Sequence, residues 1–395
     1  MPENMTLTTQ NRTTIDVVEI DRLIHRAPAT DDLLELADWL ATNGPTHLSA
    51  IERIELAERL ITRRRFLIGA GALGLGAIVG CGSDEEAAVS TTGGTHTAET
   101  PRGSVIIPAN PQRVLTVYTH DLENALILGL PVIAGPGEQG RSDAPFPPYL
   151  VEAFGAQLDS ITQIVHRPEI NFEQLAALQP DVILSGMFGN IDIGYDKLDA
   201  IAPTVTYRYS EGEEFTLIPW REVLRQNGVQ FQREDEAEDW ITRFEQRAGD
   251  LRERLVPEWR GATYAIIAPS GDQFWMYGAT GGHTARTLSE ELGIELADSV
   301  NRLLAAASQR SQGGGAVSYE LMGELDANVL FILVSAGADG TPDRSGVEAL
   351  TTQALWATLP AVQAGHVHEF TGDIWYESGV TALVFLDIVE QALLG

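Results

Sequence analysis

One amphipathic stretch in the middle of the chain constrains the fold more than any other feature. Between residues 234 and 256, apolar side chains recur every three or four positions, which is the repeat of one helical face. The stripe consists of Ala237, Trp240, Ile241, Phe244, Ala248, Leu251 and Leu255. At about 1.5 Å per residue it predicts a helix of roughly 35 Å, which we expect to end before Pro257. Because the opposite face is densely charged, this helix is expected to lie on the surface of the protein.

Strand and helix patterns alternate on both sides of this stretch. "RVLTVYT", "DLENALILGL" and "PVIAGPG" precede it, and "ATYAIIAP" and "TARTLSEELG" follow it. Such alternation predicts parallel sheets. Two segments, "NFEQLAALQPDVILSG" and "SYELMGELDANVLFILV", share a layout of polar N-cap, aromatic, glutamate, amphipathic turn and apolar strand. This weak internal duplication predicts an α/β protein with two similar lobes separated by the long helix.

The segment "RRRFLIGAGALGLGAIVGCGS" admits three interpretations. Gly69, Gly71 and Gly74 match a dinucleotide-binding spacing, but arginines rather than a strand precede them. The apolar run Phe66–Gly80 is shorter than the roughly 20 residues that a spanning helix needs. A charged start, a short apolar run and small residues at its end are typical of a secretory signal. "TRRRFL" looks like a twin-arginine export signal, and "IVGC" resembles a lipobox in which Cys81 is lipidated.

These patterns predict six segments, of which the first has an undecided role. It is either a small cytoplasmic appendage or the result of a start site placed too far upstream. The six are an N-terminal extension (1–60), the signal (61–81), a polar flexible tether (82–103), an N-terminal lobe (104–233), a linking helix (234–256) and a C-terminal lobe (257–395).

Charge and missing motifs narrow the class of function. With 56 acidic and 26 basic residues the chain has a net charge of −30, which repels nucleic acid and anionic lipid. The sequence contains no G-x-S-x-G, H-E-x-x-H, C-x-x-C or Walker motif. Cys81 is the only cysteine, so an intrachain disulfide is excluded. We therefore expect neither an enzyme nor a resident cofactor, and no nucleic-acid partner.

Several pieces of the chain together resemble a known family. "IIPANPQRVLTVYTHDLENALILGL", "INFEQLAALQPDVIL", "SYELMGELDANVLFI" and "LWATLPAVQAGHVHEF" are, in order and spacing, similar to the substrate-binding lipoproteins of ferric-siderophore, haem and cobalamin ABC importers. The resemblance covers roughly residues 103–395. It implies two Rossmann-like lobes bridged by a rigid helix, with the ligand in the cleft between them.

The resemblance also implies partners. The protein would be an extracytoplasmic monomer, anchored to the membrane by a lipid on Cys81, that delivers a ferric siderophore as cargo to an ABC permease and its ATPase. One surface glutamate per lobe would dock onto permease arginines, and by position these are Glu173 and Glu320. A carboxylate at the start of a helix is also favoured by the helix dipole alone, which is the structural alternative.

Candidate ligand residues lie where strands end. A ferric siderophore needs arginine forks and aromatic walls at the carboxyl ends of the strands. The candidates are Tyr118, Arg141, Trp275, Tyr277, Arg344 and Trp375. Aromatic residues at such places also serve simply to pack the lobes.

Other functions remain open at this stage. His366 and His368 in "GHVHEF" lie two apart, so on a strand they face the same way, and with His120, His166 or His283 they would form a zinc site. A haem or cobalamin receptor belongs to the same binding class. A secreted α/β enzyme, or a sensor lipoprotein without a transporter, is the alternative from a different class.

Overall fold

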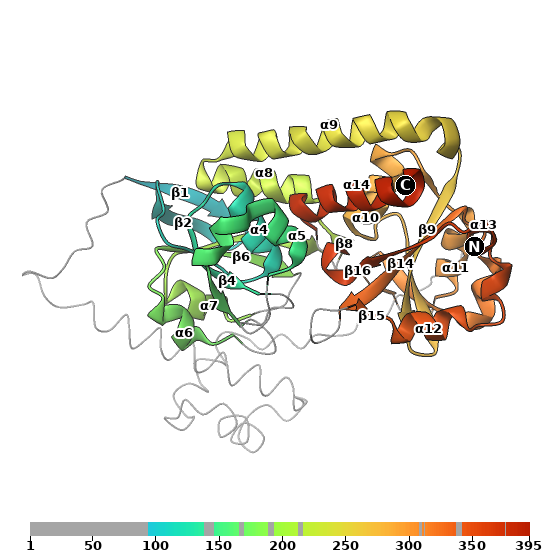
Figure 1. Cartoon of the computed structure of the whole chain (residues 1–395). Helices are drawn as coiled ribbons and strands as arrows, with labels where there is room; N and C mark the ends of the chain where they lie inside the picture. Colours follow the sequence, from blue (N-terminus) through green and yellow to red (C-terminus); the bar gives the residue numbers. More distant parts are fainter. Residues whose placement is uncertain are drawn as a thin grey trace, which may run out of the picture. The chain divides into compact units, whose positions relative to one another are not determined.

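The computed structural model describes only part of the chain. The described residues are 94–137, 146–165, 170–188, 193–211, 216–307, 310–311, 313–336, 342–375 and 377–395. All of them belong to one compact unit, Val89–Gly395 (Figure 1). The other unit, Met1–Ala88, lies outside the described residues, and so do the predicted signal, Cys81, Arg141 and His166.

The first half of this unit forms a mostly parallel sheet with strand order β5-β4-β3-β6-β7-β8. The parallel strands are β3 (Val114–Thr116), β4 (Val132–Pro136), β5 (Thr162–Ile164), β6 (Val182–Phe188) and β7 (Thr204–Glu211), and β8 (Thr216–Leu217) runs antiparallel to β7. The helices are α4 (Thr119–Ile127), α5 (Pro148–Phe154), η2 (Gly155–Ser160), α6 (Phe172–Ala177), α7 (Tyr195–Asp199) and α8 (Trp220–Phe231). Leu115, Ile183 and Val205 are fully buried, as expected for a parallel sheet covered on both faces.

The second half forms a mixed sheet, whereas the sequence predicted parallel sheets. β9 (Thr263–Ser270), β11 (Glu295–Leu296), β14 (Val329–Ala336) and β16 (Val367–Thr371) pair in parallel. β10 (Gln273–Tyr277), β12 (Arg310–Ser311), β13 (Gly314–Ser318) and β15 (Pro342–Asp343) pair antiparallel. The reason is the two-residue connection between Ser270 and Gln273, in which Gly271 has a φ of +59°. Such a turn joins only antiparallel strands.

The helices of the second half surround this sheet. They are α10 (Gly282–Arg286), η3 (Thr287–Glu291), α11 (Asp298–Ala305), η4 (Tyr319–Glu324), α12 (Ser345–Thr351), η5 (Trp356–Thr358), α13 (Pro360–Ala364), η6 (Gly372–Trp375) and α14 (Gly379–Leu394). The α/β organisation with two sheets, expected from the alternating pattern, is confirmed.

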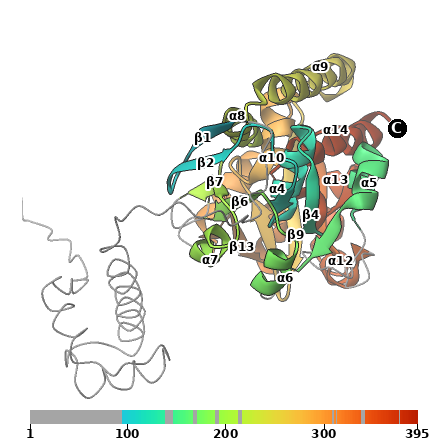
Figure 2. The ribbon, with the colours of Figure 1, turned by 90° about the vertical axis from the view of Figure 1, so that its left-hand side faces the viewer.

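The long helix α9 (Glu234–Trp259) joins the two halves. Its predicted stripe is buried except at Trp240, which is half-buried. α9 packs along α8 and α14, as Figures 1 and 2 both show. The predicted end before Pro257 is wrong: a proline in the last turn removes a single backbone donor, and Trp259 Nε1 donates to the Leu393 carbonyl at 3.0 Å, which holds that turn in place.

The predicted tether ends earlier than residue 103. β1 (Thr95–Thr100) and β2 (Gly103–Pro108) form an antiparallel hairpin beside α8 (Figure 2). Ala98 and Ile107 are buried, and His96 Nε2 lies 2.9 Å from the Gln230 carbonyl. Residues 82–93 of the predicted tether lie outside the described residues.

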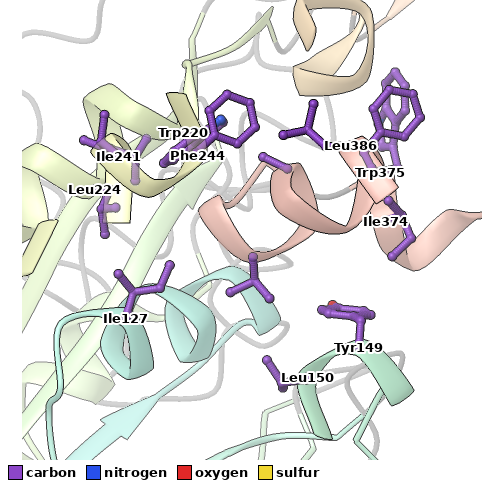
Figure 3. Packing of buried hydrophobic residues seen from close by; sticks show 14 of the residues in the cluster. Ile127, Tyr149, Leu150, Trp220, Leu224, Ile241, Phe244, Ile374, Trp375 and Leu386 are labelled. Atoms are coloured by element: carbon purple, nitrogen blue, oxygen red, sulfur yellow. The ribbon is translucent and has the colours of Figure 1, made fainter. Parts of the chain in front are cut away.

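One apolar core runs through the junction of the two halves. Trp220, Phe244, Leu386, Trp375 and Leu150 belong to the same cluster of buried residues (Figure 3). Because α14 lies among α4, α5, α8, α9 and α10, it packs against both halves. None of the helices in the described part of the chain combines the length and the apolar content needed to cross a bilayer.

Candidate ligand cleft

Three of the predicted ligand residues meet in the second half. Trp275 and Tyr277 are two positions apart on β10 and so lie on the same face of the strand, with ring centroids 6.5 Å apart. The Tyr277 ring lies 4.1 Å from that of Trp375, at the end of η6. Trp275 is half-buried, whereas Tyr277 and Trp375 are 8% and 9% exposed. We call these three residues the C-terminal aromatic group.

Two glycines make room for this group. Gly314 pairs with Tyr277 across β10 and β13, and a Cβ at Gly314 would lie 2.4 Å from Trp275 Nε1. Gly282 has a φ of +86°, and a Cβ there would lie 3.1 Å from the Trp375 ring. Any larger residue at either place would push an indole out of its position.

A second aromatic group lies at the strand ends of the first half. The His120 ring is stacked between Tyr118, at 5.4 Å, and Tyr209, at 3.9 Å. Tyr207 approaches the His120 ring edge-on at 6.2 Å. Tyr118 and His120 follow β3, and both tyrosines of β7 are buried. We call Tyr118, His120, Tyr207 and Tyr209 the N-terminal aromatic group.

A fully buried carboxylate holds this group together. Asp121 accepts hydrogen bonds from Tyr207 Oη at 2.5 Å, from the Tyr118 amide at 2.8 Å and from the Gly186 amide at 2.9 Å. Burial raises the pKa of Asp121 to about 7, and these hydrogen bonds oppose that rise. Asp121 therefore ties the ends of β3, β6 and β7 to the start of α4. Sequence reasoning missed this role, because the partners are distant in sequence.

Of the two predicted arginines, Arg141 lies outside the described residues, and Arg344 does not join the aromatic groups. Arg344 is exposed and forms a 2.7 Å ion pair with Glu369, and no contact described by the structure connects it to an aromatic residue of either group. Arg286, in contrast, is largely buried and pairs with the fully buried Glu377. Glu377 was not among the predicted residues. The one sequence feature that could have pointed to Glu377 is its position as a lone acidic residue between aromatic and small residues in "IWYESG".

The two predicted docking glutamates occupy matching positions. Glu173 is the second residue of α6, and Glu320 is the second residue of η4. Each helix follows a polar N-cap: Asn171 Oδ1 accepts from the Gln174 amide, and Ser318 Oγ accepts from the Glu320 amide. Both glutamates are exposed, and β6 and β14 follow the two helices. This geometry leaves both carboxylates accessible to a partner.

The described histidines that were considered for zinc each have other neighbours, and His166 lies outside the described residues. His366 packs edge-on against Trp259 at 4.9 Å, His368 lies beside Phe331, and His283 Nε2 is 2.7 Å from the Ile374 carbonyl. Within the described ranges no three His, Cys, Asp or Glu side chains are grouped as a metal site would require.

A cavity of about 250 Å³ lies elsewhere, near the end of α9. It is lined by Arg252, Leu255, Trp259, Arg260, Leu292 and Gly293. None of the predicted ligand residues lines it, so we place the candidate site at the aromatic groups instead.

The sequence is similar to those of curated proteins over most of its length. It is 26% identical to "Probable siderophore-binding lipoprotein YfiY" of Bacillus subtilis over 320 residues, which cover 80% of this chain and 93% of the relative. It is 22% identical to "Iron(3+)-hydroxamate-binding protein FhuD" of the same organism, covering 75% and 86%.

Solved structures show the same fold. Staphylococcus aureus SirA, complexed with staphyloferrin B, has a TM-score of 0.59 at 19% identity and covers 76% of this chain and 99% of its own. The FhuD protein from S. pseudintermedius has a TM-score of 0.58 at 19% identity, covering 76% and 99%.

A family model described as "Periplasmic binding protein" matches residues 143–373, more than half of the chain. Together with the two sheets and the joining helix, this match leads to one conclusion. The chain belongs to the periplasmic binding protein family.

Proposed function

We propose that this protein binds a ferric siderophore between its two halves and delivers it to an ABC importer. One observation carries the proposal: the two aromatic groups lie on either side of one junction. Tyr209 Oη accepts a 2.7 Å hydrogen bond from the amide of Glu377, which follows Trp375 by two residues. The junction between two lobes is a common place for a ligand site in α/β proteins.

The chemistry of the groups suits a chelate with flat or apolar faces. Indole and phenol rings offer broad apolar contact, and the half-buried Trp275 is the most accessible ring of its group. The names of the Bacillus subtilis relatives refer to siderophore and iron(3+)-hydroxamate binding, which supports the same class of ligand. No catalytic role is proposed for any residue.

Tryptophan fluorescence tests the proposal. The protein is titrated with ferrioxamine B as a ferric hydroxamate, and separately with ferric citrate, haem, cobalamin and Zn²⁺. We expect saturable quenching by a ferric chelate and none by Zn²⁺. Trp275→Phe should weaken binding, whereas the matched control Trp356→Phe, in η5 of the same half, should not. Failure of every iron chelate to bind would refute the proposal.

We further propose that Glu173 and Glu320 dock onto the permease and that a lipid on Cys81 anchors the exported monomer to the membrane. The support is the exposure of both carboxylates at equivalent helix starts, where arginines can reach them bidentately. Iron uptake by cells carrying Glu173→Ala with Glu320→Ala should fall while binding of the chelate is unchanged. The control is Glu324→Ala, an exposed glutamate also in η4. Equal uptake by all three proteins would disprove the docking role.

A further inference from the structure

Glu377 connects the two halves through its side chain as well as its backbone. Its carboxylate is fully buried, and Oε1 accepts from the guanidinium of Arg286 on α10 and from the Trp220 amide, at 3.1 Å, at the start of α8. Its own amide donates to Tyr209 Oη on β7. One residue thus touches α10 of the second half and both α8 and β7 of the first.

The carboxylate caps α8 from across the junction. The residue before α8 is Pro219, which supplies no side-chain hydrogen bond to the first turn. Glu377 supplies an acceptor there, and a negative charge at the start of a helix is favoured by the helix dipole. Burial raises the pKa of Glu377, and the charge of Arg286 opposes that rise. Arg286 is therefore the counter-charge that this buried position requires.

The next residue makes a bond to a different part of the first half. Ser378 caps α14, where its Oγ accepts from the Thr381 amide at 3.2 Å, and it also hydrogen-bonds the carboxylate of Glu123 on α4. Glu123 in turn accepts a 2.5 Å hydrogen bond from Tyr149 Oη on α5. The consecutive residues Glu377 and Ser378 therefore hold α4, β7 and α8 by directional bonds, and α5 is joined to them through Glu123.

We propose that Glu377 is a positioning residue that fixes the orientation of the two aromatic groups relative to each other. Apolar packing between α14 and its neighbours (Figure 3) resists separation of the halves but has little directional preference. Hydrogen bonds and ion pairs are directional and so select one arrangement. The expected effect on ligand binding rests on the proposed siderophore binding, whereas the effect on the arrangement of the two halves does not.

A distance measurement tests the inference without ligand. Spin labels are attached at Asp199→Cys on α7 and Glu348→Cys on α12, two exposed positions in opposite halves, in a Cys81→Ala background that leaves no other cysteine. Glu377→Gln should broaden or shift the label-to-label distance distribution.

The matched control is Glu238→Gln. It breaks the 2.6 Å pair with Arg225, which joins α9 to α8 on the exposed surface within the first half. This control should leave the distribution unchanged, since neither partner reaches the second half.

Two further variants guard against simple unfolding. Tyr209→Phe removes the acceptor of the Glu377 amide but keeps the ring stacked on His120. Glu377→Gln with Arg286→Gln removes both charges, so no buried guanidinium is left without a counter-charge. Both should fold and still broaden the distribution. Tyr209→Phe leaves the Glu377 amide without its acceptor on β7, and in the double variant a neutral amide binds the start of α8 less strongly than a carboxylate.

Binding provides the second readout. Binding is measured far below the unfolding temperature of each variant, with a ferric chelate that the wild type binds. Glu377→Gln and Tyr209→Phe should each raise the Kd about 2- to 30-fold. Unchanged distances and an unchanged Kd in variants that fold would overturn the inference. If the wild type binds no chelate but the distances still respond, the proposed function fails and the positioning role stands.

Discussion

The buried carboxylate of Glu123 leads to a quantitative prediction about pH. It is fully buried between α4, α5 and the start of α14, and burial raises its pKa from 4.5 to about 7. The hydrogen bonds from Ser378 and Tyr149 oppose the rise, and the nearby charge of Asp373 adds to it. Each pKa unit corresponds to about 1.4 kcal/mol, so ionised Glu123 costs the folded state about 3 kcal/mol.

The sign follows from proton binding in the two states. Between pH 4.5 and about 7 the unfolded chain has lost this proton and the folded protein has kept it, so the free energy of unfolding falls as the pH rises. Below pH 4.5 both states are protonated and the cost is absent. Glu123→Gln mimics the protonated carboxyl: its carbonyl accepts from Tyr149 and its amide donates to Ser378.

Urea unfolding at a series of pH values from 4 to 8.5, followed by tryptophan fluorescence, measures the effect. We expect Glu123→Gln to match the wild type near pH 4 and to exceed it by about 3 kcal/mol above pH 7.5. Asp121 contributes a similar slope to both proteins, so the difference between them isolates Glu123. A difference that does not vary with pH, or a variant less stable at high pH, would refute the reasoning.

Three more changes have expected outcomes. Gly282→Ala places a side chain at φ +86° and 3.1 Å from the Trp375 ring, so thermal unfolding should show a loss of about 1–2 kcal/mol and chelate binding should weaken. Trp259→Phe removes the donor to the Leu393 carbonyl and should cost about 1–3 kcal/mol, measured by urea unfolding; a neutral result would mean that another donor replaces it. Cys81→Ala should move the protein from the membrane fraction to the soluble fraction, as followed by immunoblot; unchanged fractionation would exclude lipid attachment there.

Local periodicity predicted the framework well. The stripe of α9 repeats every three or four residues, and six of its seven members are buried as expected. Strand and helix patterns predicted an α/β protein with two sheets, because each element carries its own apolar repeat. The antiparallel β10 escaped prediction, since its direction depends on a two-residue turn and on pairing with β9 and β13.

The surroundings of the candidate ligand residues were predicted only in part. Trp275, Tyr277 and Trp375 were expected after strand ends and they lie together, but Trp275 and Tyr277 are part of strand β10 itself. Arg344 pairs with Glu369 at the surface. An arginine after a strand has the same sequence signal whether it faces a cleft or solvent. What separates the two cases is the set of neighbours, which are supplied by other strands.

The sequence by itself determined the two α/β halves and the helix between them, because those depend on residues a few positions apart. Only the tertiary structure decided which polar side chains are buried and what they bind. Tyr207 and Asp121 are separated by 86 positions, and Tyr209 and Glu377 by 168. Tertiary packing of such distant segments decides which side chains are buried and which groups they bond. It is therefore the tertiary structure that places the Glu377 carboxylate where it joins the two halves.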